Sequence, residues 1–311
     1  MESTPAWLWA VFLVVVAGMM ALDLLVFQRT ARRVGLREAA AWTVVWVGLA
    51  LGFNLLVWWA RGPERGLEFL TGYVIEESLS LDNLFVFLVI FRFMALPAHQ
   101  YRLVLTWGIL GAVVLRGIMI GGGMALIHSF AWMLEVFGVF LLVTAIKLFT
   151  EEEHRVAPEH NVLVRLARRV FPVFPRYAGD RFFVRTGGRT AMTPLLIVLL
   201  VVSTTDVIFA TDSIPAIFAV TRDPFIVFTS NMFAVMGLRS IFFLLADILH
   251  LFRFLRQGLA LVLGFIGGKM LLERWVHLPI LWSLAGVAVI LGVSVAASWV
   301  FPERHSRAAR K

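Results

Sequence analysis

The chain has 311 residues, of which 60% are hydrophobic and only 15% charged, and its mean hydropathy is +0.87. A water-soluble core of this size would not need so much apolar sequence, so the composition predicts an all-α polytopic membrane protein embedded in a lipid bilayer. Cysteine is absent, which excludes disulfides and thiolate metal sites, and the net charge of +8 lies mostly in short loops between apolar runs, a pattern of membrane topology rather than of nucleic-acid binding.

Nine apolar stretches have about the ~20 residues that a membrane-spanning helix requires. They cover approximately residues 6–27, 39–60, 69–91, 103–122, 124–146, 192–219, 224–248, 257–273 and 279–300. The stretch MESTPAWLWA at the N-terminus has no basic segment, so the first span is expected to be a retained helix rather than a cleaved signal. The run GGGMALIH, 121–128, is expected to form the tight turn of a hairpin between the fourth and fifth spans.

The basic residues are distributed unequally between the two ends of these spans. If the N-terminus lies outside, 21 of the 28 Lys and Arg residues fall on the inner side or in the C-terminal tail. The positive-inside rule therefore predicts an inner (plasma) membrane protein with its N-terminus outside and its C-terminus in the cytoplasm. The polar loop 151–190 would be cytoplasmic, and its acidic start with His160 fits solvated loop charge better than a metal-sensing patch.

Two parts of the chain repeat the same order of polar residues. Aligning ESLSLDNLFVF (77–87) with VIFATDSIPAI (207–217) and then the two helices that follow each gives these equivalent pairs: Glu76 and Asp206, Asp82 and Asp212, Asn83 and Ser213, Arg116 and Arg239, Lys147 and Lys269. Because each unit has three spans, the copies should cross the membrane in opposite senses, as an inverted repeat. The predicted divisions are two N-terminal helices (1–66), the first repeat (67–150), the basic loop (151–190), the second repeat (191–275), and a last helix with a basic tail (276–311).

The acidic residues of this repeat lie inside apolar spans, where each costs ~2.5–3.5 kcal/mol on insertion scales. They should therefore face protein, water or an ion. Glu76 and Asp82 are six residues apart and cannot both bind one ion from an unbroken helix, whereas Asp82 and Asp212 could do so from the two repeats.

Neighbouring polar residues would extend such a site into a path. Asn83 lies seven residues after Glu76, and Ser213 seven after Asp206, so each pair shares a helix face. Gly72 and Pro215 are places at which helices could break and offer carbonyl oxygens. His128 is expected at the membrane interface, and Asp23 is held as a possible gate residue.

The carboxylates could instead serve only as structural partners of Arg116 and Arg239. Two arginines do not neutralise four acids, however, and the remaining negative charge suits a divalent cation. Oxygen donors of this kind fit Mn²⁺, Mg²⁺ or Ca²⁺ and fit Cu⁺ poorly. Arg116 and Arg239 are then expected to pair with the acids when the site is empty and to regulate it.

Several long motifs resemble the TerC family of bacterial membrane proteins, which includes the Alx-type members: ALDLLVF, SLSLDNLFVF, DVIFATDSIPAIFAVT, SNMFAVMGLRSIFFLL and FIGGKMLL. The resemblance covers nearly the whole chain. It implies a helical inner-membrane protein linked by name to tellurium resistance and by later assignment to manganese export. The metal ligands that it implies are Glu76, Asp82, Asp206 and Asp212, with Asn83 and Ser213 beside them. Ser203 departs from the family pattern, in which a glutamate is common at that position.

Three functional classes compete at this point. The first is a transporter that exports a divalent cation, with manganese as the expected substrate and no resident cofactor. The second, an intramembrane aspartyl protease, lacks its GxGD pattern because the aspartates stand in SLDN and ATDS, so no enzyme is predicted. The third is a non-transporting membrane factor for oxyanion stress or for metal supply to partner proteins, although an acidic path would repel a tellurite anion.

Overall fold

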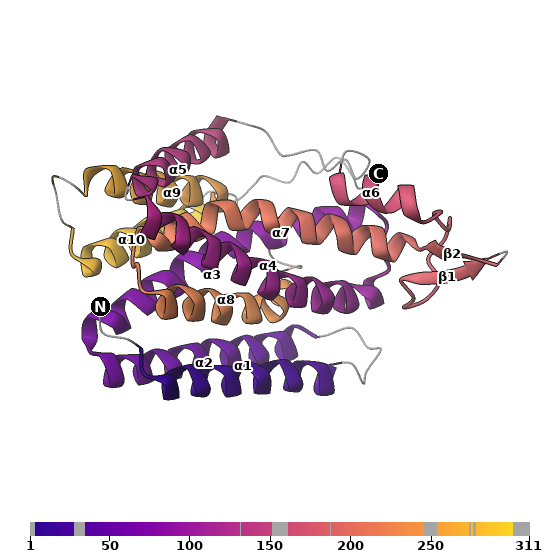
Figure 1. Cartoon of the computed structure of the whole chain (residues 1–311), viewed down its shortest axis with the longest axis horizontal. Helices are drawn as coiled ribbons and strands as arrows, with labels where there is room; N and C mark the ends of the chain where they lie inside the picture. The colour runs from indigo at the N-terminus through magenta and orange to yellow at the C-terminus, as the bar shows by residue number, and fades with distance from the viewer. Residues whose placement is uncertain are drawn as a thin grey trace.

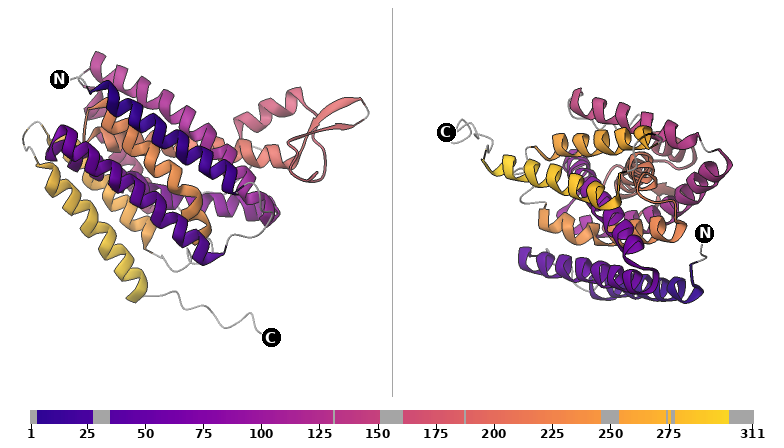
Figure 2. Two further views of the ribbon diagram at one scale, coloured as in Figure 1. Left: turned by 90° about the horizontal axis from the view of Figure 1, so that it is seen from below. Right: turned by 90° about the vertical axis from the view of Figure 1, so that its left-hand side faces the viewer.

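A computed structural model describes residues 4–27, 35–130, 132–150, 161–186, 188–245, 254–273, 275 and 278–300. The long helices run along one common axis as a bundle, and a short helix with a two-stranded hairpin projects from one end (Figures 1 and 2). In chain order the elements are α1 (Ala6–Phe27), α2 (Leu36–Arg61), α3 (Pro63–Phe93), η1 (Ala98–Gln100), α4 (Tyr101–Ser129), α5 (Met133–Thr150), α6 (Val162–Val170), β1 (Phe183–Thr186), β2 (Arg189–Met192), α7 (Pro194–Phe218), α8 (Pro224–Leu245), α9 (Leu255–Leu272) and α10 (Ile280–Val300). The described part of the chain is therefore all-α except for this hairpin.

Seven of the described helices are long and apolar enough to cross a membrane: α2, α4, α5, α7, α8, α9 and α10. Helix α8 is central, because 94% of its most apolar segment is buried inside the protein. Helices α5 and α10 lie at the periphery, because only 17% of the corresponding segment of each is buried. Apolar side chains that face outward from such a bundle are stable only in lipid. The chain is a multi-pass membrane protein.

The expected turn at residues 121–128 is wrong, because α4 continues without interruption to Ser129 and α5 begins at Met133. Within lipid, glycines keep their helical hydrogen bonds because no water competes for the backbone. Gly123 instead permits close packing, since a Cβ there would lie 2.7 Å from the Phe218 ring of α7.

The two proposed helix breaks are also absent from the described helices. Helix α3 passes through Gly72, where a Cβ would lie 2.8 Å from Ser230 Oγ of α8, so this glycine serves a close helix contact. Helix α7 passes through Pro215 and ends three residues later, so the proline removes one donor only near the helix end.

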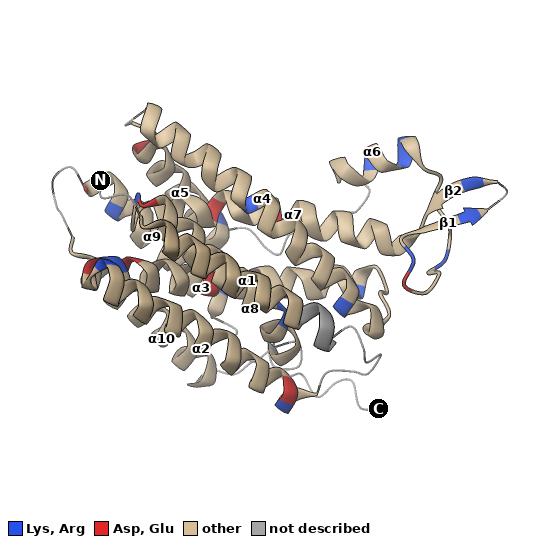
Figure 3. Ribbon diagram, turned by 60° about the horizontal axis from the view of Figure 1, so that its bottom comes forward, with Lys and Arg blue, Asp and Glu red and all other residues tan. Residues whose placement is uncertain are grey.

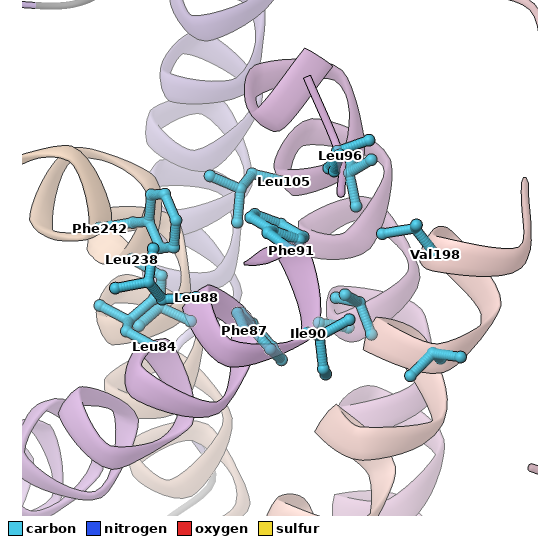
Figure 4. Close-up of a cluster of buried hydrophobic side chains, with 14 of the residues drawn as sticks. Leu84, Phe87, Leu88, Ile90, Phe91, Leu96, Leu105, Val198, Leu238 and Phe242 are labelled. Atoms are coloured by element: carbon cyan, nitrogen blue, oxygen red, sulfur yellow. The ribbon is translucent and has the colours of Figure 1, made fainter. Parts of the chain in front are cut away.

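Buried side chains of α3, α4, α7 and α8 form an apolar cluster at the end of the bundle that carries the hairpin (Figure 4). The segment between α6 and α7 is attached to this end by side-chain hydrogen bonds. Tyr177 donates to the Met94 carbonyl at 2.7 Å, and Gln100 donates to the Gly179 carbonyl at 2.9 Å. The loop 151–190 thus contains a folded unit, although its first ten residues lie outside the described ranges.

Candidate functional site

A single buried arginine joins the acidic helices of the two predicted repeats. Arg116 of α4 is fully enclosed and pairs through Nη1 with Glu76 Oε1 of α3. On its other side it binds Asp206 of α7 twice, with Nε 3.3 Å from Oδ2 and Nη2 3.2 Å from Oδ1. Two parallel N–H donors on one carboxylate fix the position of both groups.

Neutral side chains complete this arrangement, and we call Arg116, Glu76, Asp206, Ser213 and Asn231 the Arg116 cluster. Asn231 Nδ2 of α8 donates to Glu76 Oε2 at 2.9 Å, and Arg116 Nη1 donates to Ser213 Oγ at 3.4 Å. Four helices therefore meet at this point. With both carboxylates ionised, the cluster carries one uncompensated negative charge.

Asp212 lies apart from the Arg116 cluster. It is half-buried and accepts a hydrogen bond from Thr144 Oγ1 of α5 at 3.1 Å. Asp206 and Asp212 are six residues apart on a continuous helix, so their side chains point in different directions. Asp82 belongs to α3, but its side chain lies outside the described part of the structure, so its pairing with Asp212 stays a prediction.

The other predicted residues are distributed around this centre. Asn83 is buried, and its Nδ2 has no hydrogen-bond partner among the described residues. Ser203 faces α4, with its Oγ 3.9 Å from the position that a Cβ of Gly111 would take. His128 is exposed near the end of α4, and the side chain of Asp23 lies outside the described residues.

Two further buried cations, Arg239 and Lys269, contact different partners. Arg239 of α8 donates from Nη1 to Thr106 Oγ1 of α4 at 3.1 Å. Lys269 of α9 donates to the carbonyl of Ala219 at 3.3 Å, where a cation stabilises the last carbonyls of α7. Arg116 and Arg239 are equivalent in the predicted sequence repeat; Arg116 pairs with carboxylates of α3 and α7, and Arg239 donates to a threonine of α4.

Glu77 is a buried carboxylate that the sequence analysis did not select. Both of its oxygens are buried without a hydrogen-bond partner among the described residues, and Oε1 lies 3.9 Å from where a Cβ of Gly237 would stand. It therefore faces α8, about 100° around α3 from Glu76. The two adjacent glutamates in VIEES indicate a second acid in this helix. The repeat, however, matches only Glu76, because Glu76 and Asp82 have the same six-residue spacing as Asp206 and Asp212.

These donors suit a hard cation, although they do not form a complete coordination shell as they stand. Among the described residues, no group of three or more His, Asp and Glu side chains is close enough to hold a metal ion. Glu76, Asp206 and Ser213 do converge, and the guanidinium of Arg116 occupies the space between the two carboxylates. A divalent cation would need Arg116 to move or another carboxylate to approach.

A small cavity of about 10 Å³ borders Asp206, room for about one water molecule. Asp206 supplies its acidic group, and apolar side chains including Leu84, Phe87, Leu105 and Leu238 close it. Leu84, Phe87, Leu105 and Leu238 belong to the apolar cluster at the hairpin end (Figure 4). The Arg116 cluster is therefore separated from that end by an apolar seal.

Charged side chains also connect elements at the opposite end of the bundle. Arg61 at the end of α2 pairs with Asp223, before α8, at 2.7 Å. Glu68 of α3 accepts from Arg65 at 2.7 Å and from Thr221 at 2.8 Å. In Figure 3 the described charges gather at the two ends and on the hairpin, with few along the middle of the helices.

Comparison with known proteins gives consistent matches over nearly the whole chain. The family described as "Integral membrane protein TerC family" matches residues 61–306. An uncharacterized membrane protein of Myxococcus xanthus is 51% identical over 310 residues, covering 98% of this chain and 97% of that protein. A protein of Escherichia coli strain K12, whose name gives it provisionally as the membrane-bound redox modulator Alx, is 47% identical over 308 residues, covering 96% of both chains. No solved structure matches.

Proposed function

Because the chain belongs to the TerC family of integral membrane proteins, we propose that it is a non-enzymatic transporter that exports a divalent cation, Mn²⁺, by alternating access. The observation that carries this proposal is the convergence of two carboxylates, from α3 and α7, on one enclosed arginine inside an apolar bundle. Ionisable groups at this depth are costly, and they are typical of ion pathways. The oxygen donors favour a hard cation as the substrate.

In this proposal the ion pairs of Arg116 with Glu76 and Asp206 belong to the substrate-free state. Arg116 neutralises part of the acidic charge while no cation is bound, and an arriving cation competes with it for Glu76 and Asp206. Asp82, Asn83, Asp212 and Ser213 are the further proposed ligands, and Arg239 the second regulatory arginine. The exchange between arginine and metal would supply two states that the substrate biases differently.

We further propose nine membrane-spanning helices that include an inverted repeat of α3–α5 and α7–α9. Exchanging the repeats turns the contact between α3 and α8 into the contact between α7 and α4, and both pairs pack closely. Exchanging the repeats turns the extensive contact between α5 and α9 into itself, and this contact is close, with a Cβ of Gly267 only 2.9 Å from the Gly138 carbonyl. A pseudo-twofold axis requires such self-matching contacts.

For the orientation we propose an inner-membrane protein with its N-terminus outside. The positive-inside rule supports it, because α6 and the hairpin carry many arginines at the end of the bundle where α1 finishes (Figures 1 and 3).

A second candidate function is a membrane factor that does not transport but supplies metal or responds to oxyanion or redox stress. The name of the Escherichia coli relative favours it. Since the sequence contains no cysteine, a thiol-based redox role would require a partner protein. A direct flux measurement separates this candidate from transport.

Asp212→Asn tests the transport proposal. The purified protein is reconstituted in vesicles, and Mn²⁺ flux is followed with an indicator trapped inside. The variant keeps an oxygen acceptor for Thr144, so we expect flux to fall at least tenfold while thermal unfolding is little changed. Asp180→Asn, in the segment before β1, is the matched control and should transport normally. Normal flux in Asp212→Asn would remove this residue from the pathway, and no flux in the unaltered protein would favour the second candidate.

A further inference from the structure

Helix α6 has three distinct faces that the proposed transport does not use. One face buries Val164 completely against the rest of the protein. A second face leaves apolar side chains exposed at i, i+4 and i+8, with Val162 63%, Leu166 57% and Val170 66% exposed. Leu163, 41% exposed, widens this stripe. A nine-residue helix with so large an exposed apolar stripe is typical of a helix in contact with another apolar phase.

The third face of α6 is basic. Arg165, Arg168 and Arg169 are exposed and lie next to the apolar stripe around the helix. Their surroundings are basic too, because residues 161–193 contain seven arginines and a single acidic residue, Asp180. Such a surface complements a layer of negative charge that has an apolar phase directly beside it.

The position of α6 brings both faces to the edge of the bundle. At its start, Thr204 Oγ1 of α7 donates to Asn161 Oδ1 at 3.4 Å, and shortly after its end Phe174 N donates to the Met192 carbonyl at 2.8 Å. Helix α6 therefore runs beside the first ten residues of α7, about 15 Å of that helix. It lies on the outside of the bundle at the hairpin end (Figures 1 and 2). Because α7 is long and apolar enough to cross a membrane, a stripe beside it is placed to reach the bilayer.

We propose that α6 is an anionic-phospholipid binding element. Its apolar stripe inserts among acyl chains, and the guanidinium groups of Arg165, Arg168 and Arg169 bind headgroup phosphates. The proposed orientation specifies only the leaflet, which would be the cytoplasmic one, where anionic headgroups attract basic segments. The lipid contact itself is independent of whether the protein transports metal.

The absence of native cysteine makes a direct test possible, because a single introduced cysteine is the only labelling site. The full chain with Leu166→Cys carries an environment-sensitive fluorophore and is reconstituted in vesicles of phosphatidylcholine with a third phosphatidylglycerol. We expect quenching by brominated lipid and protection from aqueous iodide. Thr190→Cys, exposed on β2, is the matched control and should show the reverse. Iodide quenching at position 166 would overturn the proposal and point to a protein partner for this face.

The charge requirement is tested by titrating phosphatidylglycerol into phosphatidylcholine nanodiscs that hold the labelled protein. Each arginine is expected to contribute about fivefold to the affinity for anionic lipid. The triple variant Arg165→Gln, Arg168→Gln and Arg169→Gln should therefore bind phosphatidylglycerol up to about 100-fold more weakly. This loss appears as a higher phosphatidylglycerol fraction at the half-maximal fluorescence change, or as a weaker fluorescence change. Arg176→Gln with Arg185→Gln and Arg189→Gln removes the same charge from the hairpin region and should have a much smaller effect. Equal effects of the two sets, or the same fluorescence change with inorganic phosphate alone, would contradict an α6 lipid site.

Discussion

Arg116 shows at the scale of one residue why intramembrane charge can be tolerated. Its guanidinium is fully enclosed, and the two carboxylates that it contacts come from different helices, so it compensates charge and fixes the relative position of α3 and α7. Removing one member of a buried ion pair leaves the other without compensation, which costs far more than the pair itself gains. Arg116 is therefore a structural residue as well as a member of the proposed cation pathway.

The first prediction uses this coupling. Arg116→Gln should lower the free energy of unfolding by about 3–5 kcal/mol, because Glu76 and Asp206 lose their cation. Adding Asp206→Asn to Arg116→Gln should recover part of that loss, since one buried charge disappears. Thermal unfolding of the reconstituted single and double variants measures the interaction. Strictly additive losses would show that the pair seen in the structure contributes no coupling.

At the scale of whole elements, the contact between α5 and α9 depends on small side chains. A Cβ at Gly267 would lie 2.9 Å from the Gly138 carbonyl and 3.1 Å from the Leu142 amide nitrogen, which are backbone atoms that cannot rotate away. Helices in lipid associate largely through such close backbone packing. The next residue, Gly268, has open space around its Cβ position.

Gly267→Ala should therefore lower the free energy of unfolding by about 1–3 kcal/mol through overpacking. Gly268→Ala is the matched control on the same helix, and it should be neutral or stabilising by up to about 1 kcal/mol because alanine favours the helix. Both are measured by thermal unfolding in the same detergent or nanodisc. A smaller loss for Gly267→Ala than for Gly268→Ala would mean that α5 and α9 can separate at no cost.

Apolar length was sufficient to predict a helical chain that crosses a membrane several times, because each span must satisfy its own backbone within lipid. The glycine run at 121–123 misled the prediction for the same reason, since glycine ends helices in water but not in a membrane.

Site geometry was harder to predict. The six-residue spacing indicated that Glu76 and Asp82 point in different directions from α3. Only the fold reveals that Glu76 contacts Asn231 and Arg116, whereas Glu77 faces α8. These contacts link residues more than 30 positions apart, which no local pattern encodes.

At the scale of the whole molecule, the two ends of the bundle are held together by different chemistry. Apolar side chains pack beside Asp206 toward the hairpin end. At the other end, the Arg61–Asp223 ion pair and the hydrogen bond from Thr221 to Glu68 connect α2 and α3 to the segment before α8. An alternating-access transporter needs two seals that open in turn. The contacts at the two ends of the bundle differ in chemistry. Salt would weaken the Arg61–Asp223 ion pair, but it would not weaken the apolar contacts at the hairpin end.

The orientation of this asymmetric molecule can be determined with single cysteines. Helix α7 connects the hairpin to the turn before α8, so Arg185 and Arg222, both exposed, must lie on opposite sides of the membrane if α7 crosses it. The excess of arginine around the hairpin predicts that Arg185 is cytoplasmic. A membrane-impermeant maleimide added to intact cells should therefore label Arg222→Cys at once and Arg185→Cys only after lysis, with the cysteine-free parent as the blank.

The reverse pattern would invert the proposed orientation of the protein in the membrane, and labelling of both positions from outside would show that α7 does not span the membrane. The leaflet that α6 contacts changes with the first of these outcomes, because α6 and the hairpin belong to the same end of the bundle (Figure 1).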